Sequence, residues 1–366
     1  MAHHPCDHAL LVDLIRRGQW DTVECLCDNN PTIIEIARTK ANNTILHELC
    51  SNGSAPYALV KKVMHIWNDA TMLQNKHGDT PLHLTTRVSQ DSSYKVKLLV
   101  ECNQDALNVK NNAGQTPLGT ACVSNARLDV IELLVDTCPA LLLVKDEYGR
   151  TPAELLWSSV QKNIPGSLAI RRYLNDGGEM GNILTKAWSK FQFCIMESYR
   201  YSNAGQGRDD TSIMQPDNML CHAIIDQNVQ GGNLDQVLAI ALTIEPNLAM
   251  QVDEKGNTPL HILAGRNNDL KAINAVLQKC PHSATKKNKD GRLPLHIAVN
   301  KGKEEYFSVE KWRKIVNCIV EANIDALDCQ DGEKGNLYPF MIAASEGDVQ
   351  LTYSMLLQRP AFLFFM

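Results

Sequence analysis

The tetrapeptide Thr80-Pro81-Leu82-His83 recurs unchanged as Thr258-Pro259-Leu260-His261. Looser copies lie between and beyond these two, and the copies of the N-terminal half begin at residues 44, 80, 116 and 151. The spacing is therefore 35 or 36 residues. A period of this length predicts a solenoid, in which one structural unit is copied many times.

After a gap, the same register resumes in the C-terminal half, with copies that begin at Met219, Thr258, Leu293 and Tyr338. In several copies a Gly stands two residues before the Thr position, where a turn needs a positive φ. The Pro suits the first turn of a helix, because its missing N–H costs nothing there. A second stretch of apolar periodicity follows about ten residues later. Each copy therefore predicts a turn followed by two antiparallel helices.

At these residues the sequence resembles the ankyrin repeat family, whose pattern is Gly-x-Thr-Pro-Leu-His-x-Ala. Residues 256–264 and 291–298 match it most fully, with Ala264 one position late and Leu293 in place of Thr. The resemblance covers nearly the whole chain and implies an all-α solenoid of stacked antiparallel helix pairs linked by hairpin-like loops. We count nine pairs by it: a cap from about Asp7 to Asn30, four more up to about Asp176, and four from about Asp217 onward.

The distance from Thr151 to Met219 is roughly double the period and marks an insertion. We therefore expect a first array at residues 1–157, an inserted segment at 158–218 and a second array at 219–366. Apolar residues at helical spacing, among them Trp188, Phe191 and Ile195, predict an amphipathic helix over about residues 182–201, followed by a mobile loop. Two interpretations stay open. The favoured one packs the stripe against the ends of the fifth and sixth pairs, and the other makes it a docking or weak self-association surface.

The composition narrows the class of protein. A net charge of −5 and a pI near 6.1 argue against a general nucleic-acid or anionic-membrane binder, which would show a basic excess. The twelve cysteines have no paired spacing and indicate a reducing compartment, so we expect the cytoplasm, with the nucleus as the alternative. The N-terminus has no apolar signal region, and no run of about 18 apolar residues predicts a membrane span.

Catalytic and metal motifs are missing from the sequence. It contains no Gly-rich phosphate loop, zinc-ligand spacing or nucleophile elbow, and the repeats use nearly all of the chain. We therefore expect no enzyme activity and no cofactor. A cluster of His3, His4, Cys6 and His8 has the right donors for a transition metal, although a disordered terminus is the favoured interpretation. The basic stretch 286–292 fits either an acidic partner or a solvated hairpin tip.

The recurring histidines stand at equivalent positions of successive copies and are too far apart to share a metal ion; they are His47, His83, His222, His261 and His296. The resemblance implies that each bonds to neighbouring backbone and supports a hairpin. It also implies a non-catalytic scaffold that holds a partner protein in a concave groove of hairpin tips and first helices. The implied contact residues are Lys76, His77, Asp79, Asn112, Gln115, Glu147, Tyr148, Arg150, Glu254, Lys255, Asn257, Asp290, Arg292, Glu333 and Lys334. Tyr148 and the arginines rank highest, because Tyr and Arg are enriched at binding hot spots.

Two other functions remain open at this stage. The first alternative is a substrate-recognition or regulatory subunit of an enzyme complex. The chain also fits a peripheral membrane adaptor, because the apolar stretch 360–366 carries aromatic side chains that suit a bilayer interface. The same stretch alternatively caps the last helical pair or ends a truncated gene product. The choice of partner depends on the variable residues at the hairpin tips.

Overall fold

The computed structural model describes residues 5–88, 92–163, 182–204, 220–226, 234–266, 269–300, 308–333 and 335–364. Within these ranges the chain forms helices, and its only extended pairing is an isolated antiparallel bridge between Asp331 and Leu337. The predicted all-α solenoid is therefore confirmed. The count of nine pairs stays a prediction, because the second helix of the fifth pair falls in residues 164–181, outside the described part.

Two compact units divide the chain: unit 1 comprises residues 1–173 and 178–201, and unit 2 comprises residues 174–177 and 202–366. The α-helices associated with unit 1 are α1 (Pro5–Arg17), α2 (Trp20–Asn29), α3 (Thr32–Ile36), α4 (Ile45–Ser51), α5 (Tyr57–Ile66), α6 (Pro81–Arg87), α7 (Ser93–Cys102), α8 (Pro117–Val123), α9 (Leu128–Thr137), α10 (Pro152–Asn163) and α12 (Asn182–Ala204). Short 3-10 helices follow three of the second helices: η1 (Asn68–Thr71), η2 (Gln104–Asn108) and η3 (Pro139–Leu143).

Unit 2 repeats the same order of elements. Its α-helices are α13 (Leu220–Asp226), α14 (Leu234–Ile244), α15 (Pro259–Arg266), α16 (Leu270–Lys279), α17 (Pro294–Asn300), α18 (Val309–Ala322), α19 (Pro339–Ser345) and α20 (Val349–Gln358). The 3-10 helices are η5 (Pro246–Met250), η6 (Pro281–Thr285), η7 (Ile324–Asp328) and η8 (Pro360–Phe364).

Local sequence explains where these helices begin and which face they bury. A Pro opens α6, α8, α10, α15, α17 and α19, as the pattern predicts. The second helices are amphipathic: in α9 the buried residues are Val130, Ile131, Leu134 and Val135, which lie at helical spacing. Each helix therefore presents one apolar stripe to the helices of the neighbouring copies.

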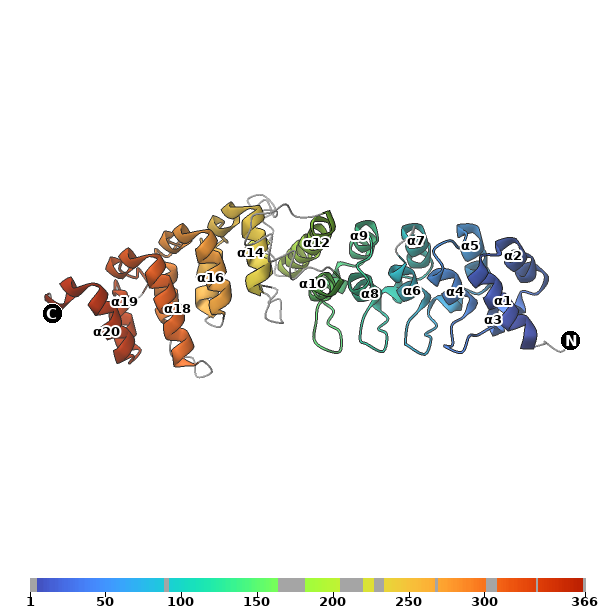
Figure 1. Ribbon diagram of the computed structural model, residues 1–366, viewed down its shortest axis with the longest axis horizontal. Coiled ribbons are helices and arrows are strands. Elements are labelled where there is room, and N and C mark those ends of the chain that lie inside the picture. Colours follow the sequence, from blue (N-terminus) through green and yellow to red (C-terminus); the bar gives the residue numbers. More distant parts are fainter. Residues whose placement is uncertain are drawn as a thin grey trace. The chain divides into compact units, whose positions relative to one another are not determined.

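In unit 1, the second helices α5, α7 and α9 lie in a row along one edge, and the hairpin loops form a row along the opposite edge (Figure 1). The first helices α4, α6 and α8 lie between these two rows and contact one another in sequence. A solenoid of this kind has two long surfaces, one made by hairpins and one made by second helices.

The predicted insertion helix is confirmed as α12, which runs three residues further than expected. Its Trp188 and Phe191 are buried, and their rings lie 6.3 and 5.3 Å from that of Trp157 in α10. Ile195 is buried as well. The stripe therefore packs on the fifth pair, as the favoured interpretation predicts, and its contact with the sixth pair stays a prediction. The mobile loop was expected from residue 202, but residues 202–204 belong to α12, and the rest of that loop lies outside the described residues.

The apolar C-terminal stretch has a packing role for at least one of its aromatic residues. Phe362 lies in η8, with its ring 4.9 Å from that of Tyr338 and 5.1 Å from that of Phe340. This contact favours the interpretation of the stretch as a cap on α19 over that of a membrane anchor. The side chains of residues 363–366 lie outside the described part.

The aromatic contact of α12 yields a stability prediction. Phe191→Ala is expected to lower the free energy of unfolding by about 3–5 kcal/mol, because it removes a fully buried ring and leaves a cavity beside Trp157. Urea denaturation followed by tryptophan fluorescence measures the change. Tyr201→Ala, at an exposed ring on the same helix, is the control and is expected to cost about 0.5 kcal/mol or less. Equal stabilities of the two variants would contradict the packing role of Phe191.

Candidate functional site: the hairpin row

Five of the described hairpins are each closed by the side chain of an Asn or Asp at the first position, whereas the first hairpin, residues 39–43, is closed by the hydroxyl of Thr39. In the second hairpin, Asn75 Oδ1 accepts hydrogen bonds from the backbone N–H groups of His77 (2.8 Å) and Asp79 (3.0 Å). The backbone N–H of Asn75 donates to the carbonyl of Asp79 at 3.0 Å. The same closed arrangement recurs at Asn111, Asp146, Asp253 and Asn288. A short polar side chain that bonds the backbone two residues on stabilises such a turn.

Neighbouring hairpins are joined through their backbones. The N–H of Asn112 donates to the carbonyl of His77 at 3.0 Å, and the N–H of Glu147 donates to the carbonyl of Ala113 at 3.3 Å. In unit 2 the N–H of Lys289 donates to the carbonyl of Lys255 at 3.0 Å. We refer to the hairpins of residues 75–79, 111–115 and 146–150 as the hairpin row of unit 1. These bonds make the row a continuous edge of the unit.

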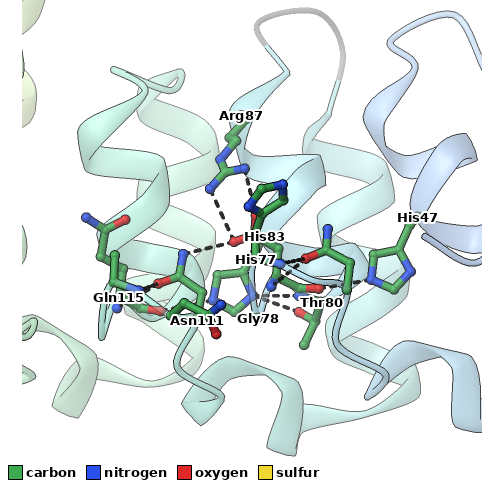
Figure 2. Close-up of polar contacts among 12 residues, drawn as sticks. His47, His77, Gly78, Thr80, His83, Arg87, Asn111 and Gln115 are labelled. Carbon is green, nitrogen blue, oxygen red and sulfur yellow. Dashed lines mark hydrogen bonds and ion pairs between the residues drawn. The ribbon is translucent and has the colours of Figure 1, made fainter. Parts of the chain in front are cut away.

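The recurring histidine couples a helix start to the next hairpin, as the resemblance implies. In the first copy, His47 Nδ1 accepts from the backbone N–H of Thr44 at 3.2 Å, and Nε2 lies 3.0 Å from the carbonyl oxygen of Asp79. Since Nδ1 accepts, the ring proton is on Nε2 and is donated to that carbonyl. Figure 2 shows His47 and His83 in these positions. The Nε2 contact recurs at His83, His222, His261 and His296, with distances of 2.9 to 3.0 Å.

Burial keeps these imidazoles neutral. It lowers the pKa of His47 and of His261 to about 4, and it also lowers the pKa of His83, His222 and His296. Protonation would place a second N–H against the backbone N–H that Nδ1 now accepts from. The histidines therefore have a structural role, which agrees with the role that the resemblance implies.

A hollow of about 440 Å³ lies on the hairpin row of unit 1. Five of the predicted contact residues line it: His77, Asp79, Asn112, Gln115 and Glu147. The structure thus brings together side chains from three successive hairpins, which the sequence placed 32 to 38 residues apart.

Arg87 and Asn111 also line this hollow and were not predicted. The Arg87 guanidinium donates to both carboxylate oxygens of Asp79, at 2.8 and 3.2 Å, and Asn111 Nδ2 donates to the same carboxylate at 2.9 Å. Figure 2 shows Arg87 and Asn111 approaching this carboxylate from two different elements. In the sequence, Arg87 is only a basic residue in the last turn of a helix, and this position does not indicate that it pairs with Asp79.

The expectation for Asp79 is corrected by this geometry. We predicted an exposed tip residue, but its side chain is fully buried and its oxygens are held by Arg87 and Asn111. Three charge-assisted bonds satisfy a buried carboxylate that would otherwise be costly. Asp79 therefore orders the hairpin row, whereas Lys76, His77, Asn112 and Glu147 are exposed.

Tyr148 is an exposed aromatic side chain of the unit 1 row, at 72%. The Arg150 guanidinium carbon lies 4.9 Å from the centre of the Tyr148 ring, and the same guanidinium donates to Asp146 Oδ2 at 2.7 and 2.9 Å. The Arg150 guanidinium is thus held in place by the Asp146 carboxylate, and it packs against the ring of Tyr148. An exposed Tyr held in one orientation is a suitable contact residue.

The predicted residues of unit 2 divide into two groups. Glu254, Lys255, Asp290 and Glu333 are exposed, and Asn257 is half-buried. Arg292, which we ranked among the highest, has only 12% of its side chain exposed and pairs with Asp331 and Glu333. It is therefore held within the hairpins instead of presenting a free guanidinium. Lys334 lies outside the described residues.

Other candidate features give no site among the described residues. Trp188, Phe191 and Ile195 are buried, so the structure does not present them as the docking surface of the second interpretation. No group of three or more His, Cys, Asp or Glu side chains lies together as a metal site in the described part. The side chains of His3, His4, Cys6 and His8 fall outside it. None of the helices described here has the length and apolar character that a membrane crossing requires.

Comparison with known families agrees with this geometry. Residues 56–146 match the family profile described as ankyrin repeats, in three copies. Residues 56–146 are thus similar to three successive ankyrin repeats. Among curated proteins, none matches the sequence. Ankyrin repeats generally mediate protein–protein interaction, and the matched segment contains the whole of the hollow except Glu147.

The hairpin glycines yield a prediction with an internal control. Gly78 has a φ of 73°, and a Cβ there would lie 2.4 Å from Asn112 Oδ1 and 2.6 Å from Asn112 N. Gly149 has a φ of 75°, but a Cβ there would meet no atom within 4 Å. Gly149→Ala is expected to cost about 1–2 kcal/mol for its backbone conformation alone. Gly78→Ala is expected to cost about 1–3 kcal/mol more, because the next hairpin must move. Chemical denaturation measures both, and equal losses would show that the hairpins are not tightly apposed.

The histidines yield a prediction about stability and pH. His261→Ala is expected to lower the free energy of unfolding at pH 7 by about 1–3 kcal/mol, because the Arg292 carbonyl and the Thr258 N–H lose their partner. A neutral His with a depressed pKa contributes stability above the unfolded pKa of about 6.5, and this contribution is lost as the pH falls toward about 4. The difference between wild type and His261→Ala is therefore expected to shrink over that interval.

Urea denaturation at several pH values tests this prediction, with His282→Ala as the control at an exposed imidazole. A constant difference between wild type and His261→Ala from pH 7 to pH 4 would contradict it. The metal content of the purified protein is expected to be unaffected by the change. Stoichiometric zinc that disappears in His261→Ala would overturn the structural role.

Proposed function

We propose that the chain is a non-catalytic scaffold that binds a partner protein on the hairpin row of unit 1. The observation that carries this proposal is the hollow of about 440 Å³, which His77, Asn112, Gln115 and Glu147 line over a floor held by Asp79 and Arg87. The exposed Tyr148 stands in the hairpin of residues 146–150, next to Glu147. A rigid, polar, concave surface with an exposed aromatic at one end suits recognition of a protein surface.

The electrostatics of the row favour a partner with polar and mixed charge. The Arg87 and Asp79 charges compensate each other, which leaves the exposed Lys76 and Glu147 as the free charges near the hollow. Such a surface distinguishes one partner protein from another by the placement of individual side chains more than by net charge. The same binding surface serves a regulatory subunit of an enzyme complex, which differs only in the identity of the partner.

The proposed location is the cytoplasm. The support for it comes from the cysteines, which are all free thiols among the described residues although the chain contains twelve. Free thiols persist in reducing compartments. Microscopy of the tagged full chain in its own cells tests this location.

Affinity capture with two matched variants tests the binding proposal. The hairpin variant carries Ala at His77, Glu147 and Tyr148, whose side chains are exposed. The control variant carries Ala at Gln104, Asn108 and Asp136, which are exposed in η2 and α9, outside the hairpins. A partner that is retained by wild type and the control, and reduced about tenfold or more by the hairpin variant, is the expected result. A partner lost equally from both variants, or from neither, would contradict binding on the hairpin row.

A further inference from the structure

A second surface of unit 1 lies away from the hairpins, between α5 and α7. Two adjoining hollows of about 440 and 400 Å³ lie there, and Leu98 and Glu101 line both of them. Tyr57 and Tyr94 line the first, and Met64 lines the second. The two hollows therefore form one continuous channel along both helices, which we call the α5–α7 groove. It belongs to the row of second helices, opposite the hairpin row (Figure 1).

The aromatic end of the groove departs from the pattern of the next repeat. Tyr57 is the first residue of α5, and Tyr94 is the second residue of α7. The same positions in the adjoining pair of helices, α7 and α9, are Ser93 and Asp129. The repeat architecture thus tolerates polar residues at this point. Most second helices begin with an apolar residue, as α9, α16 and α20 do with Leu128, Leu270 and Val349, so Tyr94 is the position that departs from the repeat pattern.

The two tyrosine rings are partly open to solvent. They pack edge to face with their centres 5.7 Å apart, yet 44% of Tyr57 and 36% of Tyr94 remain exposed. Together with the half-buried Leu98 they form an apolar strip along the groove, and Met64, which is only 3% exposed, lies at its floor. A contiguous apolar strip on an otherwise polar surface is typical of an interaction site.

Two lysines give the middle of the groove a positive charge. Lys61 and Lys97 are the fifth residues of α5 and α7, so one stands on each helix at the same level. Lys97 is 3.9 Å from Glu101 and both side chains are more than 60% exposed, which makes their ion pair weak. Lys62, by contrast, is engaged by Glu24 and Asp28. The two lysines outnumber the single carboxylate of Glu101 among the lining residues, so the net charge that the groove offers to a ligand is positive.

We propose that the α5–α7 groove binds an acidic amphipathic helix of a partner protein. Tyr57 and Met64 lie seven residues apart on α5, which corresponds to about 10.5 Å along its axis. A helix seated beside α5 matches this distance with two apolar anchors at positions i and i+7 of one face. Its residues i+3 and i+4 then face Lys61 and Lys97, where a carboxylate is the complementary group. This surface is separate from the hairpin row and does not depend on the function proposed there.

A designed peptide serves as the probe. It is a fluorescein-labelled helix of about 18 residues, with Leu at i and i+7, Glu at i+3 and i+4, and Ala, Gln and Lys elsewhere. Fluorescence anisotropy with the full chain measures binding of this peptide, of a version with Gln in place of both Glu, and of a version with Lys in place of both Glu. The expected order is Glu tightest, then Gln, then Lys, and the advantage of Glu is expected to fall as salt is added.

Two variants of the protein test separate parts of the proposal. Tyr57→Ser with Tyr94→Asp installs the residues of the adjoining repeat and is expected to weaken binding of the Glu peptide at least tenfold, or about 1.4 kcal/mol. Lys61→Gln with Lys97→Gln is expected to remove the difference between the Glu and Gln peptides while both still bind. Circular dichroism melting confirms that each variant is folded, and the lysine variant keeps the test valid if the tyrosine variant does not fold.

The hairpin variant at His77, Glu147 and Tyr148 is the matched control and is expected to bind the peptide like wild type. If this variant retains the partner in affinity capture, the result contradicts only the proposal for the hairpin row. The proposal for the α5–α7 groove is tested separately by peptide binding. Peptide binding that is unaffected by both groove variants, or a peptide order that is independent of charge, would overturn the proposal. So would sedimentation data in which the tyrosine variant abolishes a dimer of the wild-type chain, because the groove would then bind a second copy.

Discussion

The hydrogen bond from a buried, neutral imidazole to the carbonyl of the next hairpin is the constraint on which the rest of the solenoid depends. At His83, Nδ1 accepts from the backbone of Thr80 while Nε2 donates to the carbonyl of Gln115, 32 residues further on. One ring therefore sets the start of a helix and the position of the following hairpin. Because Nδ1 and Nε2 have opposite roles, the ring is effective only in one tautomer and only when it is uncharged.

This coupling explains why the hairpins can carry function. A loop that projects from a helix pair is usually mobile, but here its backbone is fixed by the histidine behind it, by the Asn or Asp within it and by the hairpin beside it. The entropy of ordering the loop is thus lost on folding and not on binding. Exposed side chains such as Glu147 and Tyr148 are held on a preorganised edge.

Much of the fold followed from local signals in the sequence. The Thr-Pro-Leu-His copies predicted the helix starts at Pro81 and Pro259, and helical spacing of apolar residues predicted α12. Both signals act within a few residues, so a single sequence reveals them. The burial of Asp79 did not follow, because it depends on Arg87 and on Asn111, which belongs to the next copy. An acidic residue in a polar turn has the same local signature whether it faces solvent or a neighbouring hairpin.

Buried lysines were missed for the same reason. Lys95 occupies the third position of α7, where α5, α9, α16 and α20 carry the buried apolar residues Leu59, Val130, Ala272 and Leu351. It is 1% exposed, and its Nζ donates to the carbonyl of Asn52 at 2.7 Å, just beyond the C-terminus of α4. Lys190 of α12 does the same for Asn125, beyond the end of α8. Burial lowers the pKa of both lysines, but each satisfies carbonyl groups that a helix end leaves open.

These lysines and the α5–α7 groove show how equivalent positions in different repeats can be compared. Every position has counterparts in the other copies, so a residue that departs from them either has a local structural partner or has none. Lys95 and Lys190 have partners at the ends of first helices, and Arg87 has one in Asp79. Tyr57 contacts Tyr94, but the adjoining pair of helices has polar residues at both positions. Tyr94 therefore places an aromatic ring, 36% exposed, at a position that is polar in the adjoining repeat, which is the feature on which the binding role proposed for the groove rests.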